Sequence, residues 1–124
     1  MLSNLLLVGI GGFLGSALRF LISVMINRQV STHFPFGTFT VNIVGSLLIG
    51  VLYGLWAREF VDDSTSRIWI SGFCGGFTTF STFSYDSLTL INHGQYLTFI
   101  IYAAASVILG LAAVFAGMSL VRFS

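Results

Sequence analysis

Four long apolar segments, separated by short polar ones, follow one another along the chain. Pro35, a charged cluster around Asp62 and a turn at Gly94 divide them. A transmembrane helix needs roughly 20 mostly apolar residues, and each segment is long enough to provide them. The pattern predicts an all-α membrane protein, a single domain with both termini on one side. Its four transmembrane helices are expected at residues 4–26, 36–57, 68–92 and 96–121.

The composition points to the lipid bilayer as the main solvent of this chain. Charged residues make up 7% of its 124 residues, whereas a soluble domain has about 25%. A soluble fold of this size could not cover its surface with so few charges. The net charge is +1, and the chain has no lysine and no basic run, so nucleic acid is not expected as a partner.

The arginines are almost evenly divided between the two predicted sides of the membrane. The side of the termini has Arg58, Arg67 and Arg122. The other side has Arg28, and also Arg19 if its side chain reaches outward. An excess of arginine and lysine on one side sets the orientation of a protein in the membrane. The near balance here allows one preferred orientation. It also allows dual topology, in which copies insert both ways and form an antiparallel homodimer. Four short helices enclose little room for a water-lined path, which favours an oligomer.

The third segment has a sequence that does not suit a continuous helix. Gly75 and Gly76 each cost about 1 kcal/mol relative to alanine, and Thr78 and Thr79 are β-branched. Serine and threonine hydroxyls also compete for backbone partners. Irregular backbone at membrane depth is tolerated only inside protein or beside a polar cavity. We therefore predict a helix broken in mid-membrane and able to hold ions; the alternative is a regular helix with its hydroxyls bonded to the preceding turn.

Three side chains near this segment are candidate anion ligands. Phe80 and Phe83 are three residues apart, so they share a face if the chain is helical. Their ring edges are electropositive and could contact an anion without a full charge. With 13 phenylalanines in the chain, such a pair alone is also typical of core or lipid-facing positions. Asn42 offers two amide donors, either to an ion or to a neighbouring helix.

Arg19 and Asp86 are the ionisable residues that lie well inside the predicted spans. Charges at such positions are functional candidates. Each lies about two turns before the end of its predicted helix, on the same side, so they could form an ion pair or line a vestibule in which Arg19 attracts anions. His33 and His93 fall in loops, and the sequence contains no metal-binding cluster and no nucleophile–base motif. We do not expect an enzyme.

Three segments resemble the Fluc (CrcB) family of fluoride channels. They are GGFLGSALR at 11–19, GTFTVNIVGS at 37–46 and GFCGGFTTFSTFS at 72–84. Length and four-helix layout also match over essentially the whole chain. The resemblance implies a fluoride-selective channel that exports fluoride passively across the cell (inner) membrane. It also implies a dual-topology antiparallel homodimer with two parallel pores.

The resemblance also implies roles for individual residues. In the family, ring edges and an amide contact fluoride, and hydroxyls lie along its path. The matching pore positions here are Phe80, Phe83, Asn42, Ser81, Thr82, Tyr102 and Ser106. Backbone carbonyls that match Gly75 and Thr78 hold a structural sodium ion on the dimer axis. Family members often carry glutamate at the position of Asp86.

Physical reasoning from the residues agrees with this function and leaves two alternatives. A fluoride pore must replace strong hydration with several donors and still release the ion, which neutral amides, hydroxyls and ring edges can do. A small dual-topology drug/proton antiporter would need a titratable carboxylate in the membrane, typically a glutamate in the first helix. This chain has Arg19 there, and Asp86 is its only candidate. A non-transporting assembly subunit is the other alternative.

Overall fold

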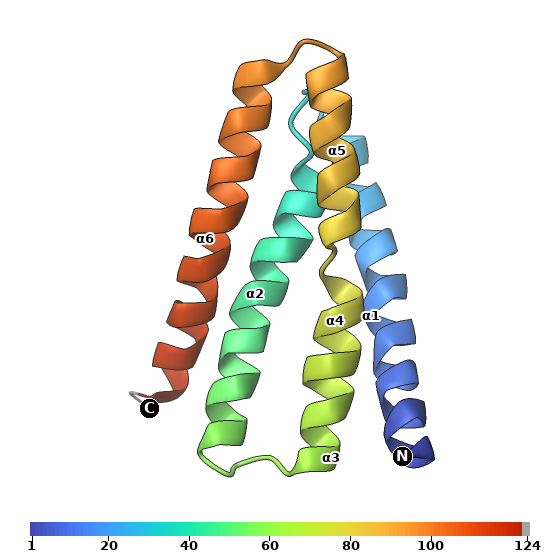
Figure 1. Cartoon of the computed structure of the whole chain (residues 1–124), viewed down its shortest axis with the longest axis vertical. Helices are drawn as coiled ribbons and strands as arrows, with labels where there is room; N and C mark the ends of the chain where they lie inside the picture. The colour runs from blue at the N-terminus through green and yellow to red at the C-terminus, as the bar shows by residue number, and fades with distance from the viewer. Residues whose placement is uncertain (123–124) are drawn as a thin grey trace.

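The computed structural model describes residues 1–122, and this part of the chain is helical, without strands (Figure 1). Four crossings run antiparallel to one another along the sequence. Both termini lie at the same end of the bundle, together with the link between the second and third crossings (Figure 1). The elements are α1 Leu2–Gln29, α2 Phe36–Ala57, α3 Asp63–Ser66, the π-helix η1 Arg67–Cys74, α4 Gly75–Phe77, α5 Phe80–Asn92 and α6 Tyr96–Arg122.

Helix α1 is longer than the predicted range of 4–26. It continues through the polar residues 27–29 and stops at Val30, whose backbone is extended with φ −123° and ψ 130°. Residues 27–29 include neither glycine nor proline, so they can continue the helix. Polarity alone was therefore a poor guide to the end of α1. The side chain of Asn27 then accepts a hydrogen bond from the Gly37 N–H at 3.2 Å, which joins the end of α1 to the start of α2.

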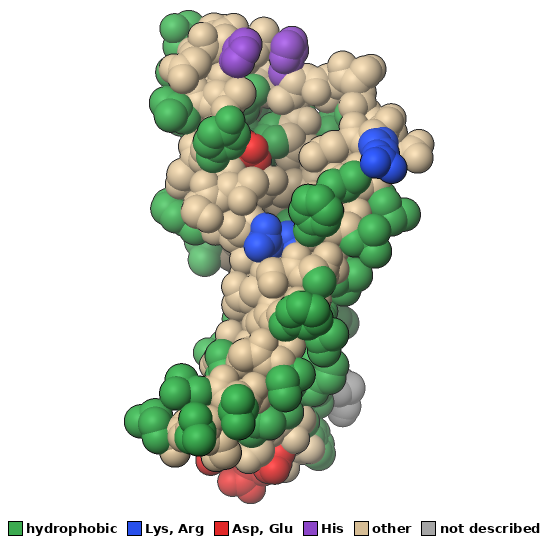
Figure 2. All heavy atoms as spheres, turned by 90° about the vertical axis from the view of Figure 1, so that its right-hand side faces the viewer, with side chains coloured by type: hydrophobic (Ala, Val, Ile, Leu, Met, Phe, Trp, Pro, Cys, Tyr) green, Lys and Arg blue, Asp and Glu red, His purple; other side chains and the backbone are tan. Residues whose placement is uncertain are grey.

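The outer surface of the bundle is strongly apolar. Helices α1, α2 and α6 are long and apolar enough to cross a membrane. Large side chains such as Phe13 and Phe115 are 72% and 73% exposed. Figure 2 shows the histidines at one end of the molecule and most of the acidic side chains at the other, with apolar side chains between. This arrangement suits a protein whose middle is surrounded by lipid acyl chains.

Glycines allow the helices to approach closely in two places. A Cβ atom on Gly11 would collide with the carbonyl oxygen of Ile68, so α1 packs directly on η1. A Cβ atom on Gly50 would likewise collide with the carbonyl oxygen of Val114, so α2 packs directly on α6. Helix packing in lipid depends on such small residues. The bundle therefore consists of two close pairs, and the third crossing lies between α1 and α2 (Figure 1).

The third crossing is divided by two extended residues. Helix α4 ends at Phe77, and α5 begins at Phe80. Between them Thr78 has φ −87° and ψ 157°, and Thr79 has φ −151° and ψ 122°. The Thr79 side chain caps α5 by accepting a hydrogen bond from the Thr82 N–H, which satisfies one of the free donors at a helix start. The break thus brings a helix C-terminus and a helix N-terminus together.

Candidate functional site

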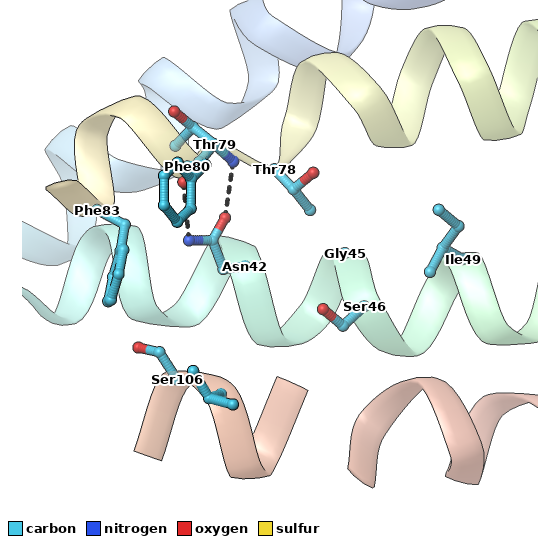
Figure 3. A pocket seen from close by; sticks show the side chains of 10 residues that line it. Asn42, Gly45, Ser46, Ile49, Thr78, Thr79, Phe80, Phe83 and Ser106 are labelled. Carbon is cyan, nitrogen blue, oxygen red and sulfur yellow. Dashed lines mark hydrogen bonds between the residues drawn. The ribbon is translucent and has the colours of Figure 1, made fainter. Parts of the chain in front are cut away.

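The amide of Asn42 holds the break between α4 and α5 in place. Its Oδ1 accepts a hydrogen bond from the Thr79 N–H at 2.8 Å, and its Nδ2 donates to the Thr79 carbonyl oxygen at 3.1 Å (Figure 3). One side chain thus binds both polar groups of a residue that has left the helix. A primary amide has two N–H groups, so the bond to Thr79 leaves the second N–H of Asn42 for another acceptor.

A pocket of about 310 Å³ opens beside this amide. It lies between α2, the break, the first turn of α5 and the middle of α6 (Figure 3). Four of the predicted pore residues line it together: Asn42, Phe80, Phe83 and Ser106. The other lining residues are Gly45, Ser46, Ile49, Thr78, Thr79 and Val107. The structure therefore gathers an amide, two aromatic rings and a hydroxyl from three separate helices around one space.

The hydroxyl of Ser106 is the unsatisfied polar group of this pocket. Its Oγ is buried and has no hydrogen-bond partner within residues 1–122. Leaving a buried polar group unpaired costs about 1–3 kcal/mol, so native structures seldom do so without a reason. A serine hydroxyl can donate to an anion. Ser106 is one of the residues that line the pocket, so a group bound there is a candidate for the missing partner.

The two aromatic rings form one wall of the pocket. The ring centroids of Phe80 and Phe83 are 5.8 Å apart, and the planes are inclined by 39°. Phe80 is 78% exposed in the single chain, and Figure 3 shows its ring beside the amide of Asn42. Phe83 is supported from behind by Tyr102, at a centroid distance of 5.0 Å. Ring edges carry partial positive charge, so this wall is compatible with an anion.

The two helix ends at the break have opposite polarity. The first N–H groups of α5 lack partners within the helix, and a helix N-terminus carries about half a positive elementary charge. The last carbonyls of α4 similarly form a negative end. The start of α5, at Phe80, belongs to the pocket wall. The backbone therefore favours an anion on the α5 side of the break and a cation on the α4 side.

The carbonyl groups at the end of α4 suit a small cation. The Thr79 N–H, which would bind the Gly75 carbonyl in a continuous helix, donates to Asn42 instead. Gly75 is exposed, with no atom within 4 Å of a Cβ position. Thr78 is extended, so its carbonyl is also outside the helical pattern. Hard cations such as sodium prefer oxygen ligands, and these carbonyls fit that requirement.

Ser81 and Thr82, two further predicted pore residues, do not line the pocket. The Ser81 Oγ lies 3.3 Å from the Thr79 Oγ1, and the Thr79 hydroxyl donates to the Thr82 Oγ1 at 3.3 Å. Both side chains therefore surround the cap of α5. They lie beside the break but do not line the pocket.

Arg19 and Asp86 do not form the ion pair that the sequence left open. Within residues 1–122 no ion pair joins them; the Arg19 Nε donates to the Gly76 carbonyl at 2.9 Å. Because α1 continues to Gln29, Arg19 lies nearly three turns before its end, whereas Asp86 lies less than two turns before the end of α5. Arg19 contacts the end of α4, whereas Asp86 lies on α5 beyond the break.

Asp86, which is half-buried, instead lies beside the buried residues Tyr102 and Thr38. The Tyr102 hydroxyl donates to the Asp86 Oδ2 at 3.2 Å, and the Thr38 side chain lies beside this carboxyl group. Tyr102 is fully buried and is absent from the pocket lining. The structure thus separates Tyr102 from the other predicted pore residues, although its ring contacts Phe83.

Sequence reasoning missed the roles of Thr79 and Thr38. The role of Thr79 could have been found, because a threonine directly before a helical pattern is a typical N-cap. Thr38 gave no comparable signal. A lone hydroxyl in an apolar helix shows its partner only when the fold brings Asp86 and Tyr102 beside it.

Comparisons with known proteins agree with this arrangement. A family model described as CrcB-like protein, Camphor Resistance (CrcB), matches residues 6–118. A Phocaeicola vulgatus protein named fluoride-specific ion channel FluC is 47% identical over 94% of this chain and 97% of its own length. Proteins of the same name from Azobacteroides pseudotrichonymphae and Rhizobium meliloti are 44% and 43% identical, over 99% and 98% of both chains. The resemblance inferred from the three motifs is thereby confirmed.

Proposed function

This chain belongs to the CrcB family, and from that premise we propose that it is a passive, fluoride-selective ion channel. Fluoride is the ion named for the relatives that match it over nearly their whole length. An ion channel is a transport protein and not an enzyme. The observation that carries the proposal is the joint lining of one pocket by the Asn42 amide, the rings of Phe80 and Phe83, and Ser106, whose hydroxyl has no hydrogen-bond partner within residues 1–122.

The pocket would bind fluoride through neutral donors only. The second N–H of Asn42, the hydroxyl of Ser106 and the first N–H groups of α5 can each donate a hydrogen bond, and the edges of Phe80 and Phe83 add a weaker attraction. Together they replace part of the hydration shell. Because none carries a full charge, the ion can leave again, as conduction requires. Ser81 and Thr82 would extend the path beyond Phe80, and Tyr102 would hold Phe83 in place.

The vestibule before the pocket would depend on Arg19. Its bond to Gly76 fixes a positive charge near the break without placing it among the residues that line the pocket. A fixed cation at this distance raises the local concentration of anions. Asp86 does not line the pocket and would have a structural role, because its carboxyl group already accepts a hydrogen bond from Tyr102.

The working unit would be a dual-topology antiparallel homodimer with two pores in the cell (inner) membrane. The pocket is open on one side in the single chain, and Phe80 is largely exposed, so a second copy can close the path. The near balance of arginines between the two sides is consistent with insertion in both orientations. In this arrangement fluoride leaves the cell down its own gradient.

A structural sodium ion would lie where the α4 ends of two copies meet. The carbonyl groups of Gly75 and Thr78 would hold it, since both lie outside the helical hydrogen-bond pattern. Such an ion would supply a fixed positive charge near the anion path. This chain would present the two carbonyl groups to the ion. Asn42 contributes because it accepts the Thr79 N–H, which leaves the Gly75 carbonyl without its helical hydrogen bond.

The drug/proton antiporter alternative is not supported. The relatives reported above are all named fluoride-specific channels. The only candidate proton carrier, Asp86, is bonded within the protein and stays outside the pocket.

Fluoride efflux from liposomes that contain the purified protein tests the proposal. We expect rapid efflux of fluoride, read with a fluoride electrode, and no comparable efflux of chloride. Phe80→Ile removes a ring edge from the pocket wall, so it should abolish fluoride efflux while the protein remains folded. Absence of fluoride efflux from correctly folded protein would remove the channel function, and a drug-coupled proton flux assay would then decide whether the protein is an antiporter.

A further inference from the structure

The fluoride pocket extends along α2 for more than one turn past Asn42. Besides Asn42, this helix contributes Gly45, Ser46 and Ile49 to the lining, and Figure 3 shows these residues following one another beside the pocket. Ser46 comes four residues after Asn42, so the two side chains share a face of α2 and are about 6 Å apart along its axis. The pocket therefore has a second level, at Ser46, beyond the level of the Asn42 amide.

Of the four hydroxyl groups on residues that line this pocket, two are already used by the protein. The Thr78 hydroxyl donates to the carbonyl oxygen four residues earlier at 2.8 Å, and the Thr79 hydroxyl caps α5. The hydroxyls of Ser46 and Ser106 have no hydrogen-bond partner within residues 1–122. Both free hydroxyls belong to the α2 and α6 side of the pocket, so the unused donors lie on that side.

The Ser46 hydroxyl is accessible from the pocket. A serine in a helix often bonds to the carbonyl four residues earlier, as Ser16 of α1 does to the Gly12 carbonyl at 2.7 Å. Ser46 makes no such bond within the described residues, and it is half-buried rather than enclosed. Its O–H group is therefore free to donate to a group that enters the pocket.

Helix α6 leaves room in front of the Ser46 hydroxyl. The residue opposite is Gly110, one turn after Ser106, and a Cβ atom on Gly110 would lie 3.8 Å from the Ser46 Oγ. No other atom of a neighbouring helix lies within 4 Å of that position. One turn further along α2, a Cβ atom on Gly50 would collide with the Val114 carbonyl oxygen. The space between the two helices therefore closes one turn after Ser46.

We propose that Ser46 is a further hydrogen-bond donor to fluoride, one turn along the path from Asn42 and Ser106. This inference rests on the proposed channel function. A conducted ion must leave its first donors again, and neighbouring sites of moderate strength make that step easier than a single strong site does. The O–H of Ser46 would receive the ion as it leaves the Asn42 amide, and Gly110 keeps the space for it free.

Fluoride efflux from liposomes that contain Ser46→Ala tests this role. We expect efflux at least about fivefold slower than that of the wild type, because one hydrogen bond to a charged ion is lost. The melting temperature in detergent should not fall, since the hydroxyl has no partner within residues 1–122. Ser16→Ala is the matched control: it removes a hydroxyl that is bonded to Gly12 and does not line the pocket, so efflux should stay close to wild type.

Gly110→Ala tests the same site from the opposite helix. The added methyl group would be in ordinary contact with the Ser46 Oγ, at 3.8 Å, and would occupy the space in front of it. Efflux should therefore fall. The melting temperature should stay the same or rise, because alanine favours a helix more than glycine does. Slower efflux from a protein that is at least as stable distinguishes a blocked ion site from a damaged fold.

The outcomes separate this role from the channel function itself. Fluoride efflux by the wild type with unchanged efflux by Ser46→Ala would overturn the role of Ser46 and leave the channel function intact. Equal losses in Ser46→Ala and Ser16→Ala, or full efflux by Gly110→Ala, would also overturn it. Absence of efflux from folded wild-type protein would remove both the channel function and the role of Ser46.

Discussion

Two groups of polar side chains lie one helical turn apart on α2 and α6, yet their hydrogen bonding differs. In the fluoride pocket, α2 and α6 contribute Asn42 and Ser106. One turn away, the same helices contribute Thr38 and Tyr102, which hold Asp86 of α5. The first group keeps donors without partners. In the second group the Tyr102 hydroxyl already donates to the carboxyl group.

The difference shows that unused hydrogen-bonding capacity locates an ion site better than charge does. In the sequence, Asp86 is the more conspicuous residue, because ionisable groups inside a span are rare. In the structure its carboxyl group is occupied, whereas the neutral hydroxyl of Ser106 is buried and unpaired. A binding site for a strongly hydrated ion must offer donors that the fold has not already used.

The largest effect should come from reversing the polarity of the pocket. Asn42→Asp replaces a donor by a carboxylate and places it against the Thr79 carbonyl oxygen. A negative charge about 4 Å from an anion costs about 4 kcal/mol at an effective dielectric of 20, or about a thousandfold in binding. Fluoride efflux from liposomes should therefore fall to the protein-free background.

Asn42→Ser keeps one neutral hydrogen-bond donor and adds no charge. It is therefore the control for the negative charge that Asn42→Asp introduces. It should retain more efflux than Asn42→Asp. Efflux of Asn42→Asp close to that of the wild type, in protein that elutes as the wild type does in size-exclusion chromatography, would place the fluoride path outside this pocket.

A smaller effect is expected from removing the unpaired hydroxyl. Ser106→Ala deletes one donor to the ion, and a hydrogen bond to a charged group is worth about 1.5–3 kcal/mol, so fluoride efflux should fall at least about tenfold. The melting temperature in detergent should stay the same or rise, because an unsatisfied buried group disappears.

Ser87→Ala is the matched control for this experiment. The Ser87 hydroxyl is also on a buried residue, but it donates to the Phe83 carbonyl at 2.8 Å. Its removal should cost about 1 kcal/mol of stability and leave most of the efflux. If the two serine variants lose efflux equally, the unpaired state of Ser106 has no functional meaning.

The fold could be predicted from the sequence further than the site could. Hydropathy indicated the four helical passes, because lipid demands long apolar helices with satisfied backbones; within residues 1–122, three helices are long and apolar enough to cross a membrane. The bounds of α2, Phe36–Ala57, equal the predicted range. The end of α1 at Gln29 was missed, because residues 27–29 are polar but can form a helix. Helix ends depend on local backbone conformation, which hydropathy does not record.

The candidate site could be predicted as a set of residues but not as a network. Motifs nominated Asn42 and Phe80, the family resemblance added Ser106, and the structure brings all three together. No sequence pattern could show that Asn42 donates one N–H to the Thr79 carbonyl. Nor could it show that Arg19 donates to the Gly76 carbonyl instead of pairing with Asp86. These facts depend on contacts between residues distant in the chain. Such contacts exist only once the helices have packed.

The smallest effect on efflux is expected in the group around Asp86, and it tests the comparison most sharply. Tyr102→Phe keeps the ring behind Phe83 but removes the hydroxyl that donates to Asp86 at 3.2 Å. The carboxyl group then has fewer partners, which should lower stability by about 1–3 kcal/mol, measured as unfolding in detergent. Fluoride efflux should stay within about threefold of the wild type, since no donor to the ion is lost. A collapse of efflux as severe as that of Ser106→Ala would mean that fluoride passes the Tyr102 hydroxyl, and that this group opens during conduction.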